Sequence, residues 1–220
     1  RGILYGINVH NNSLVVFDPF SRDLENANKV VFAKSGAGKS YACKVEALRA
    51  LVLGVEYYVI DPEDEYRQVC EAVGGQYIRL SGTSPHHINP FDVPAVSGAD
   101  GEAPDPLAER LLALQGLLGL MLSDRGSALD QREKGALDAA LLETYRRAGI
   151  GRDPRTHSRP SPVLRDLHTV LREQGDQYNL ADRLERYVDG SLGQVFSSQT
   201  SVDLDRPFVV FNVRDLDPDL

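Results

Sequence analysis

A glycine-rich stretch, AKSGAGKSYA (Ala33 to Ala42), constrains the fold of this chain more than any other feature. The segment before it, KVVFA, is short and rich in β-branched and aromatic residues, which predicts a strand over residues 29–33. The segment after it repeats apolar residues at helical spacing and stops at Gly54, which predicts a helix. A strand, a glycine turn and a helix in this order are typical of an α/β fold.

The glycine-rich stretch matches the phosphate-loop pattern GxxxxGK[ST], with Ala33 in place of the first glycine. In such a loop, backbone N–H groups at a helix N-terminus hold phosphate oxygens, and glycines adopt conformations that a side chain would strain. Ala33 is tolerated if its φ angle is negative. Lys39 is the candidate catalytic cation on the β- and γ-phosphates, and the Ser40 hydroxyl is the candidate Mg²⁺ ligand. The full set of candidate nucleotide-binding residues is Ser35, Gly36, Ala37, Gly38, Lys39, Ser40 and Tyr41.

Acidic residues follow the next predicted strand, EYYVID (Glu56 to Asp61), whose continuous apolar run predicts burial on both faces. Asp61 is either a Mg²⁺ ligand of the Walker B kind or a carboxylate at the sheet edge near the phosphates. Asp64 and Glu65 are also consistent with capping the next helix, because helix N-termini favour acids. Nowhere in the chain does a run of four apolar residues lead into Asp-Glu, so the usual hydrolytic acid pair is missing from it.

The remaining pattern predicts an α/β core that is interrupted by helices. A hairpin that turns at Asn11-Asn12 precedes the core, and strands over 76–80 and 206–213 extend a mainly parallel sheet. We therefore divide the chain into a hairpin and core (1–106), an all-helical insert (107–190) and a return to the core sheet (191–220). After a loop rich in Pro and Gly over 84–106, apolar spacing predicts helices over 107–122, 129–147, 163–173 and 180–188.

Composition limits the possible classes of protein. The net charge of −8 argues against indiscriminate binding along DNA. The longest apolar segment, 111–122, is shorter than the roughly 20 residues that cross a bilayer. We expect its leucine stripe (Leu111, Leu114, Leu118 and Leu122) to lie in a core. Cys43 and Cys70 lack the spacing of a zinc site, so we expect two reduced, largely buried thiols. His86 and His87 are expected in a turn, because no third metal ligand has usable spacing.

A basic segment, RRAGIGRDPRTHSRP (Arg146 to Pro160), contains five arginines. Arginines beside glycine and proline suit contacts with phosphate, so one hypothesis is a contact with DNA through Arg146–Arg159. The other hypothesis is a solvated surface loop, since the segment has no aromatic residue that could stack on a base.

Four segments carry a combination of family motifs: NKVVFAKSGAGKSYACK (28–44), VIDPEDEYRQVCEAVGGQYIRL (59–80), HINPFDV (87–93) and YVDGSLGQVFSSQTSVDLDRPFVVFNVRDL (187–216). Together they resemble the motor ATPases of conjugative and type IV secretion systems, the TraC–VirB kind, in the HerA–FtsK superfamily of P-loop motors. The resemblance extends from about Leu4 to the end of the chain.

This resemblance implies a RecA-like P-loop NTPase core that uses ATP and Mg²⁺. It also implies an ATP-driven machine that works as a hexamer or dimer with other secretion-system subunits, peripherally at the cytoplasmic face of the inner membrane. Gly36, Gly38, Lys39 and Ser40 match the nucleotide and Mg²⁺ site. Asp61 and Glu65 match the acids of the DPxxEY motif, and we take them as candidate metal ligand and candidate catalytic acid.

In the family, a Walker B strand ending in Asp-Glu follows the region where this chain stops, and a neighbouring subunit supplies an arginine finger. The chain starts at Arg1 and not at Met, so we expect it to be the front part of a longer motor domain, weak or inactive in hydrolysis by itself. Two alternatives remain at this point: a HerA- or FtsK-like translocase that acts on duplex DNA, and a non-hydrolysing module in which ATP only orders an assembly.

Overall fold

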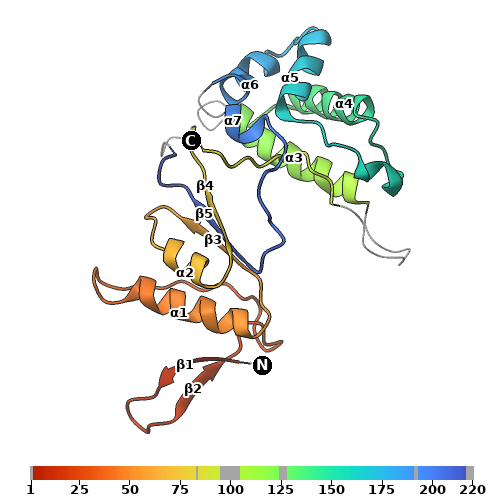
Figure 1. Cartoon of the computed structure of the whole chain (residues 1–220). Coiled ribbons are helices and arrows are strands. Elements are labelled where there is room, and N and C mark those ends of the chain that lie inside the picture. The colour runs from red at the N-terminus through yellow and green to blue at the C-terminus, as the bar shows by residue number, and fades with distance from the viewer. Residues whose placement is uncertain (1, 83, 95–104, 124–127, 191–192, 217–220) are drawn as a thin grey trace. The chain divides into compact units, whose positions relative to one another are not determined.

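The computed structural model describes residues 2–82, 84–94, 105–123, 128–190 and 193–216 (Figure 1). It forms two compact units, one from Arg1–Leu80 with Asp203–Leu220 and one from Ser81–Val202. The first unit is α/β and the second is helical, which confirms an α/β core interrupted by helices. The helical unit extends beyond the expected insert of 107–190 on both sides, because the segments around Asn89 and Thr200 are hydrogen-bonded to each other.

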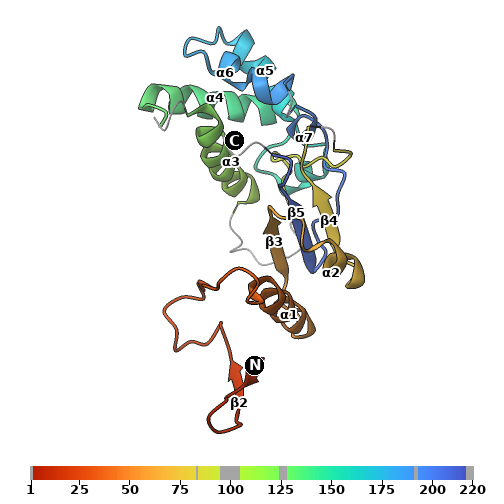
Figure 2. The same cartoon turned by 90° about the vertical axis from the view of Figure 1, so that its left-hand side faces the viewer.

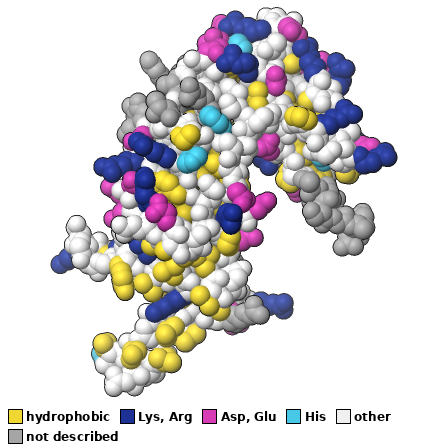
Figure 3. Space-filling model, viewed as in Figure 1, with side chains coloured by type: hydrophobic (Ala, Val, Ile, Leu, Met, Phe, Trp, Pro, Cys, Tyr) yellow, Lys and Arg dark blue, Asp and Glu magenta, His cyan; other side chains and the backbone are white. Residues whose placement is uncertain are grey.

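An antiparallel hairpin of β1 (Ile3–Ile7) and β2 (Leu14–Phe17) opens the first unit, as predicted. A two-stranded hairpin is only marginally stable alone, and this one is attached to the first helix. The Arg49 guanidinium donates a hydrogen bond to the Leu4 carbonyl, and the Tyr5 hydroxyl lies 2.7 Å from a carboxylate oxygen of Glu46. The hairpin nevertheless exposes the apolar side chains of Ile7, Leu14, Val16 and Phe17 (Figure 3).

A parallel three-stranded sheet forms the centre of the same unit. Figure 2 shows the last strand, β5 (Phe208–Asn212), between β3 (Tyr57–Asp61) and β4 (Gln76–Arg79). Helices α1 (Lys39–Val52) and α2 (Arg67–Ala72) contribute to one shared cluster on one face of this sheet. That cluster consists of the buried residues Ala47, Val59, Cys70, Phe208 and Val210.

Two expectations about strands are wrong. Residues 29–33 form no strand, and Val30 and Phe32 are 74% and 92% exposed, because no strand of the described chain pairs with them. The strand that ends in Asp61 is buried on one face only, because alternate side chains of a strand point to opposite faces and the described elements cover just one of them at this strand. Tyr58 and Ile60 are accordingly 54% and 74% exposed.

The helical unit contains the four helices that apolar spacing predicted. Each begins within two residues of its expected start, and the first two begin after aspartate N-caps, Asp105 and Asp130. The four are α3 (Pro106–Leu122), α4 (Gln131–Arg147), α5 (Leu164–Glu173) and α6 (Leu180–Val188). Two short elements that spacing did not predict are the 3₁₀ helix η1 (Pro154–Ser158) and α7 (Gly193–Phe196).

The core of the helical unit confirms the expected leucine stripe. Leu114, Leu118 and Leu122 are buried, and Leu111 packs partly buried against them. Tyr145 is buried in the same core, and its hydroxyl donates a hydrogen bond to the Phe91 carbonyl at 2.7 Å. That bond satisfies the one polar group that this large side chain brings inside.

Both cysteines are free thiols. Cys70 is fully buried, and burial raises the pKa of its thiol to about 11. Cys43 is partly buried, so both thiols are largely shielded from solvent, as expected. Of the helices in the described ranges, none has both the length and the apolar character needed to span a bilayer.

Candidate functional site

The candidate nucleotide-binding residues lie in one turn that leads directly into α1. Gly36 and Gly38 have φ angles of 75° and 88°, the left-handed region that favours glycine. The turn is closed by the Ala37 N–H, which donates to the Lys34 carbonyl at 3.1 Å. Ala33 is not among the residues with positive φ, so its methyl group is tolerated where the motif usually has glycine.

The N-terminus of α1 presents unused hydrogen-bond donors. Its first backbone bond runs from the Ala42 N–H to the Gly38 carbonyl at 2.9 Å, so the amides of Lys39, Ser40 and Tyr41 have no acceptor within the helix. Gly38 offers no side-chain cap, and the first turn contains no acid. Free amides, the positive end of the helix dipole and an exposed lysine suit an anion. The residues present therefore fit a phosphate group.

Asp61 lies buried at the carboxyl end of β3, with 2% of its surface exposed. One carboxylate oxygen accepts the backbone N–H of Glu65 at 3.1 Å, and the other accepts that of Tyr66 at 2.9 Å. These bonds satisfy the buried charge within the chain. Asp61 thus lies at the carboxyl edge of the sheet, and a role for it in binding Mg²⁺ stays a prediction.

Glu65 lies beside α1 rather than on the next helix. Its carboxylate is 3.8 Å from the ammonium of Lys44, which itself lies 5.3 Å from the centre of the Tyr66 ring. Burial raises the pKa of the Tyr66 hydroxyl to about 12. Within the described ranges, no hydrogen bond or ion pair joins Asp61 or Glu65 to residues 35–41. No group of three or more His, Cys, Asp or Glu in these ranges is arranged to hold a metal ion.

A polar network at the carboxyl edge of the sheet was missed by sequence reasoning. The Tyr77 hydroxyl donates to Asp64 at 2.5 Å and accepts from the Asn212 amide at 2.7 Å, and the Arg67 guanidinium lies 4.5 Å from the Tyr77 ring centre. The bond from Tyr77, with the charge of Arg67, holds the pKa of Asp64 below its ordinary value.

The capping role considered for Asp64 and Glu65 is therefore wrong, because α2 has no side-chain cap. The residue type was one weak indication of this arrangement, because aspartate tolerates left-handed turn conformations. In the structure Asp64 has a φ of 59°.

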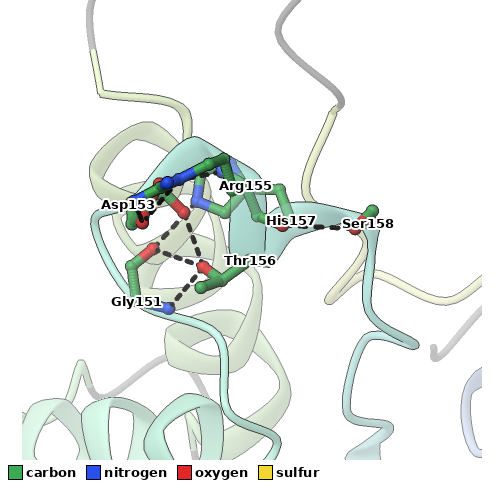
Figure 4. A network of polar contacts seen from close by, with 6 residues as sticks. All are labelled: Gly151, Asp153, Arg155, Thr156, His157 and Ser158. Atoms are coloured by element: carbon green, nitrogen blue, oxygen red, sulfur yellow. Dashed lines mark hydrogen bonds and ion pairs between the residues drawn. The ribbon is translucent and has the colours of Figure 1, made fainter.

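The basic segment folds onto itself around η1 (Figure 4). The Arg155 guanidinium donates to both carboxylate oxygens of Asp153, and this pairing lowers the pKa of Asp153. The Gly151 N–H donates to the Thr156 hydroxyl at 3.0 Å, and a ring nitrogen of His157 lies 2.9 Å from the Gly151 carbonyl (Figure 4). The segment is thus an ordered turn and not an open loop.

The guanidiniums next to η1 also have partners in the chain. Arg146 and Arg147 both bind the carboxylate of Glu143 and lower its pKa to about 2. Arg159 donates to the Gly149 carbonyl at 2.8 Å. Three of the five arginines therefore pair with carboxylates of the same unit, and a fourth is held by a backbone carbonyl.

Two of the motif segments meet in the helical unit. The Asn89 N–H donates to the Thr200 hydroxyl at 2.8 Å, and the Asn89 side-chain amide donates to Asp92 at 3.1 Å and to the Pro162 carbonyl at 2.9 Å. A further bond joins the same two segments, from the His87 N–H to the Ser201 hydroxyl at 2.9 Å. This part of the motif set therefore fastens the helical unit.

Comparison with known proteins gives the family. The sequence model of the TraG P-loop domain matches residues 12–149, a range that contains both the glycine turn and the DPxxEY acids. The solved structure of VirB4 of Thermoanaerobacter pseudethanolicus matches with a TM-score of 0.78 and 32% sequence identity, over 100% of this chain and 58% of that chain. The present chain thus spans less than two thirds of that relative. No curated protein matches the chain in sequence.

The TraG match covers more than half of the 220-residue chain, and the VirB4 structure shares its fold throughout. The chain therefore belongs to the TraG P-loop domain family, among the motor ATPases of the TraC–VirB kind that its motifs resemble.

Proposed function

We propose that this chain is the ATP-binding part of a motor ATPase that energises transfer of DNA or protein by a type IV secretion or conjugation system. The observation that carries the proposal is the turn at residues 35–41, where two glycines with positive φ lead into a helix whose first amides are free. Membership of the TraG P-loop family supports the same proposal.

We assign roles to the residues of the turn as follows. The backbone amides of Lys39, Ser40 and Tyr41 bind phosphate oxygens within the turn formed by Ser35 to Gly38, and the Lys39 ammonium balances the phosphate charge. The Ser40 hydroxyl is the protein ligand for Mg²⁺, which when bound neutralises part of the phosphate charge. Asp61, whose two oxygens are taken by backbone donors, is a structural residue in this proposal, and Glu65, 44% exposed at its side chain, is the candidate acid.

The test compares two lysines of the same turn. Lys39→Ala is expected to weaken the binding of Mg-ATP by roughly 10- to 100-fold, because a charged hydrogen-bond partner of the phosphates is lost. Lys34→Ala is the matched control, since Lys34 is also exposed and its backbone carbonyl, not its side chain, closes the turn. Isothermal titration calorimetry measures both. Equal affinities of wild type and Lys39→Ala for Mg-ATP would contradict the assignment of the nucleotide site to this turn.

The activity of the whole protein is also a proposal, because this chain spans 58% of its VirB4 relative. We propose the cytoplasmic face of the inner membrane as the location and other secretion-system subunits as partners, on the strength of the family. We do not extend the proposal to DNA contact through Arg146–Arg159, because most of these guanidiniums are bound within the chain.

A further inference from the structure

The helical unit carries an open groove between α3 and α4, which lie side by side (Figure 1). Its volume is about 780 Å³. Two leucines of α3 stand along it, Leu112 and Leu120, which are 69% and 76% exposed. The opposite side of α3 carries the buried leucine stripe, so this helix is apolar on both sides. Leucines exposed together on a second side of a helix are typical of a surface that another polypeptide covers.

Glycines keep this groove open. Gly116 and Gly119 of α3 and Gly135 of α4 line it, and a Cβ atom added at any of the three would meet nothing within 4 Å. None has a positive φ, so neither backbone conformation nor packing inside the unit requires glycine. Glycine within a helix costs stability relative to alanine. A second polypeptide that approaches the two backbones closely would offset that cost.

The charged residues at the rim of the groove indicate which polypeptide covers it. Lys134 and Asp138 stand one helical turn apart on α4 and both line the groove. Lys134 is exposed and has no ion pair among the described residues, and Asp138 accepts a hydrogen bond from the Gln115 amide at 2.6 Å. One cation and one anion side by side form a surface that is complementary to itself under a two-fold rotation.

We propose that a second copy of this chain covers the groove in a two-fold dimer. Leu112 and Leu120 each lie four residues from Gly116, so an axis near Gly116 brings Leu112 of one α3 opposite Leu120 of the partner subunit. The glycines admit this close approach of the two helices. The same rotation sets Lys134 opposite Asp138 of the partner subunit. The dimer does not depend on the nucleotide site.

Sedimentation equilibrium of the 220-residue chain at micromolar concentrations, without nucleotide, tests the proposal. The wild type is expected to dimerise. Gly116→Leu, which fills the groove in both copies, is expected to weaken the dimer by about 100-fold. Circular dichroism melting should show the Gly116→Leu monomer at least as stable as wild type, since leucine is the better helix former and the site is open.

Two further comparisons distinguish a specific dimer interface at the groove from non-specific association. Leu120→Ala is expected to weaken the dimer by roughly tenfold or more, whereas Leu142→Ala, at an exposed leucine of α4 outside the groove, leaves it unchanged. Lys134→Glu weakens the dimer, and the double variant Lys134→Glu/Asp138→Lys restores it. A wild type that stays monomeric at every concentration, or a Gly116→Leu variant that dimerises as well as wild type, overturns the proposal in favour of another protein in the groove.

Discussion

Single buried polar residues hold distant segments of this chain together. Asn89 has 3% of its surface exposed, yet it bonds to residues that lie far along the chain, at Pro162 and Thr200. A buried amide with all its partners in place stabilises one arrangement of the segments it joins, because every alternative leaves a polar group without a partner. The HINPFDV motif thus has an architectural role in joining these segments.

Asn89→Ala should lower the free energy of unfolding by about 1–3 kcal/mol, because it leaves the Pro162 carbonyl and one oxygen of Asp92 without their donor. Urea unfolding followed by circular dichroism measures the change. Asn26→Ala is the matched control, since Asn26 is exposed and its side chain bonds only within its own turn. A midpoint that is the same for both variants would contradict this account.

Residue types were enough to predict some parts of the site and not others. Gly36 and Gly38 have the backbone conformations that the motif requires, because the motif is a local pattern. The partners of Asp61 were not predictable, since they are backbone amides brought to it by a turn in which Asp64 takes a left-handed conformation. Residue types along the chain do not specify which amides will face a carboxylate.

At the scale of elements, helices were predicted well and strands less well. The spacing of apolar residues within a helix reports on that helix alone, so α3 to α6 appear where the pattern placed them. A strand also needs a neighbour with which to bond. Residues 29–33 have the composition of a strand but no partner strand in the described chain, and they leave Phe32 exposed.

Two phenylalanines allow the paired strand β5 to be compared with the unpaired residues 29–33. Phe208→Ala should cost about 3–5 kcal/mol of unfolding free energy, because Phe208 is fully buried in the middle strand. Phe32→Ala should change it by less than about 0.5 kcal/mol, because that ring is 92% exposed. Chemical denaturation of the 220-residue chain measures both. A large loss for Phe32→Ala would mean that residues 29–33 pair with a strand after all.

At the scale of the whole molecule, the chain combines an α/β unit, which contains the glycine turn, with a helical unit. The family match covers part of the helical unit, and the structural relative covers all of it. In our proposal, the turn at residues 35–41 binds the nucleotide. The acid pair expected of a motor is missing from the sequence, and Asp61 is held by backbone amides. We therefore propose that nucleotide binding and turnover are separable properties of this chain.

We expect the 220-residue chain to bind Mg-ATP but to hydrolyse it more slowly than about 10⁻² s⁻¹, the range of P-loop proteins that lack their full catalytic set. A phosphate-release assay measures the rate, and chelation of Mg²⁺ should weaken binding. Turnover near 1 s⁻¹ or faster would show that an acid in this chain suffices. The variant Glu65→Gln would then identify whether that acid is the partner of Lys44.

The order of the strands has a consequence for synthesis. Because β5 separates β3 from β4, neither of these earlier strands has its neighbour until all of Ser81–Val202 has emerged from the ribosome. At ordinary rates of translation this interval is on the order of ten seconds. During it β3 and β4 both lack the strand that pairs with them, and unpaired strand edges of this kind can associate with other chains.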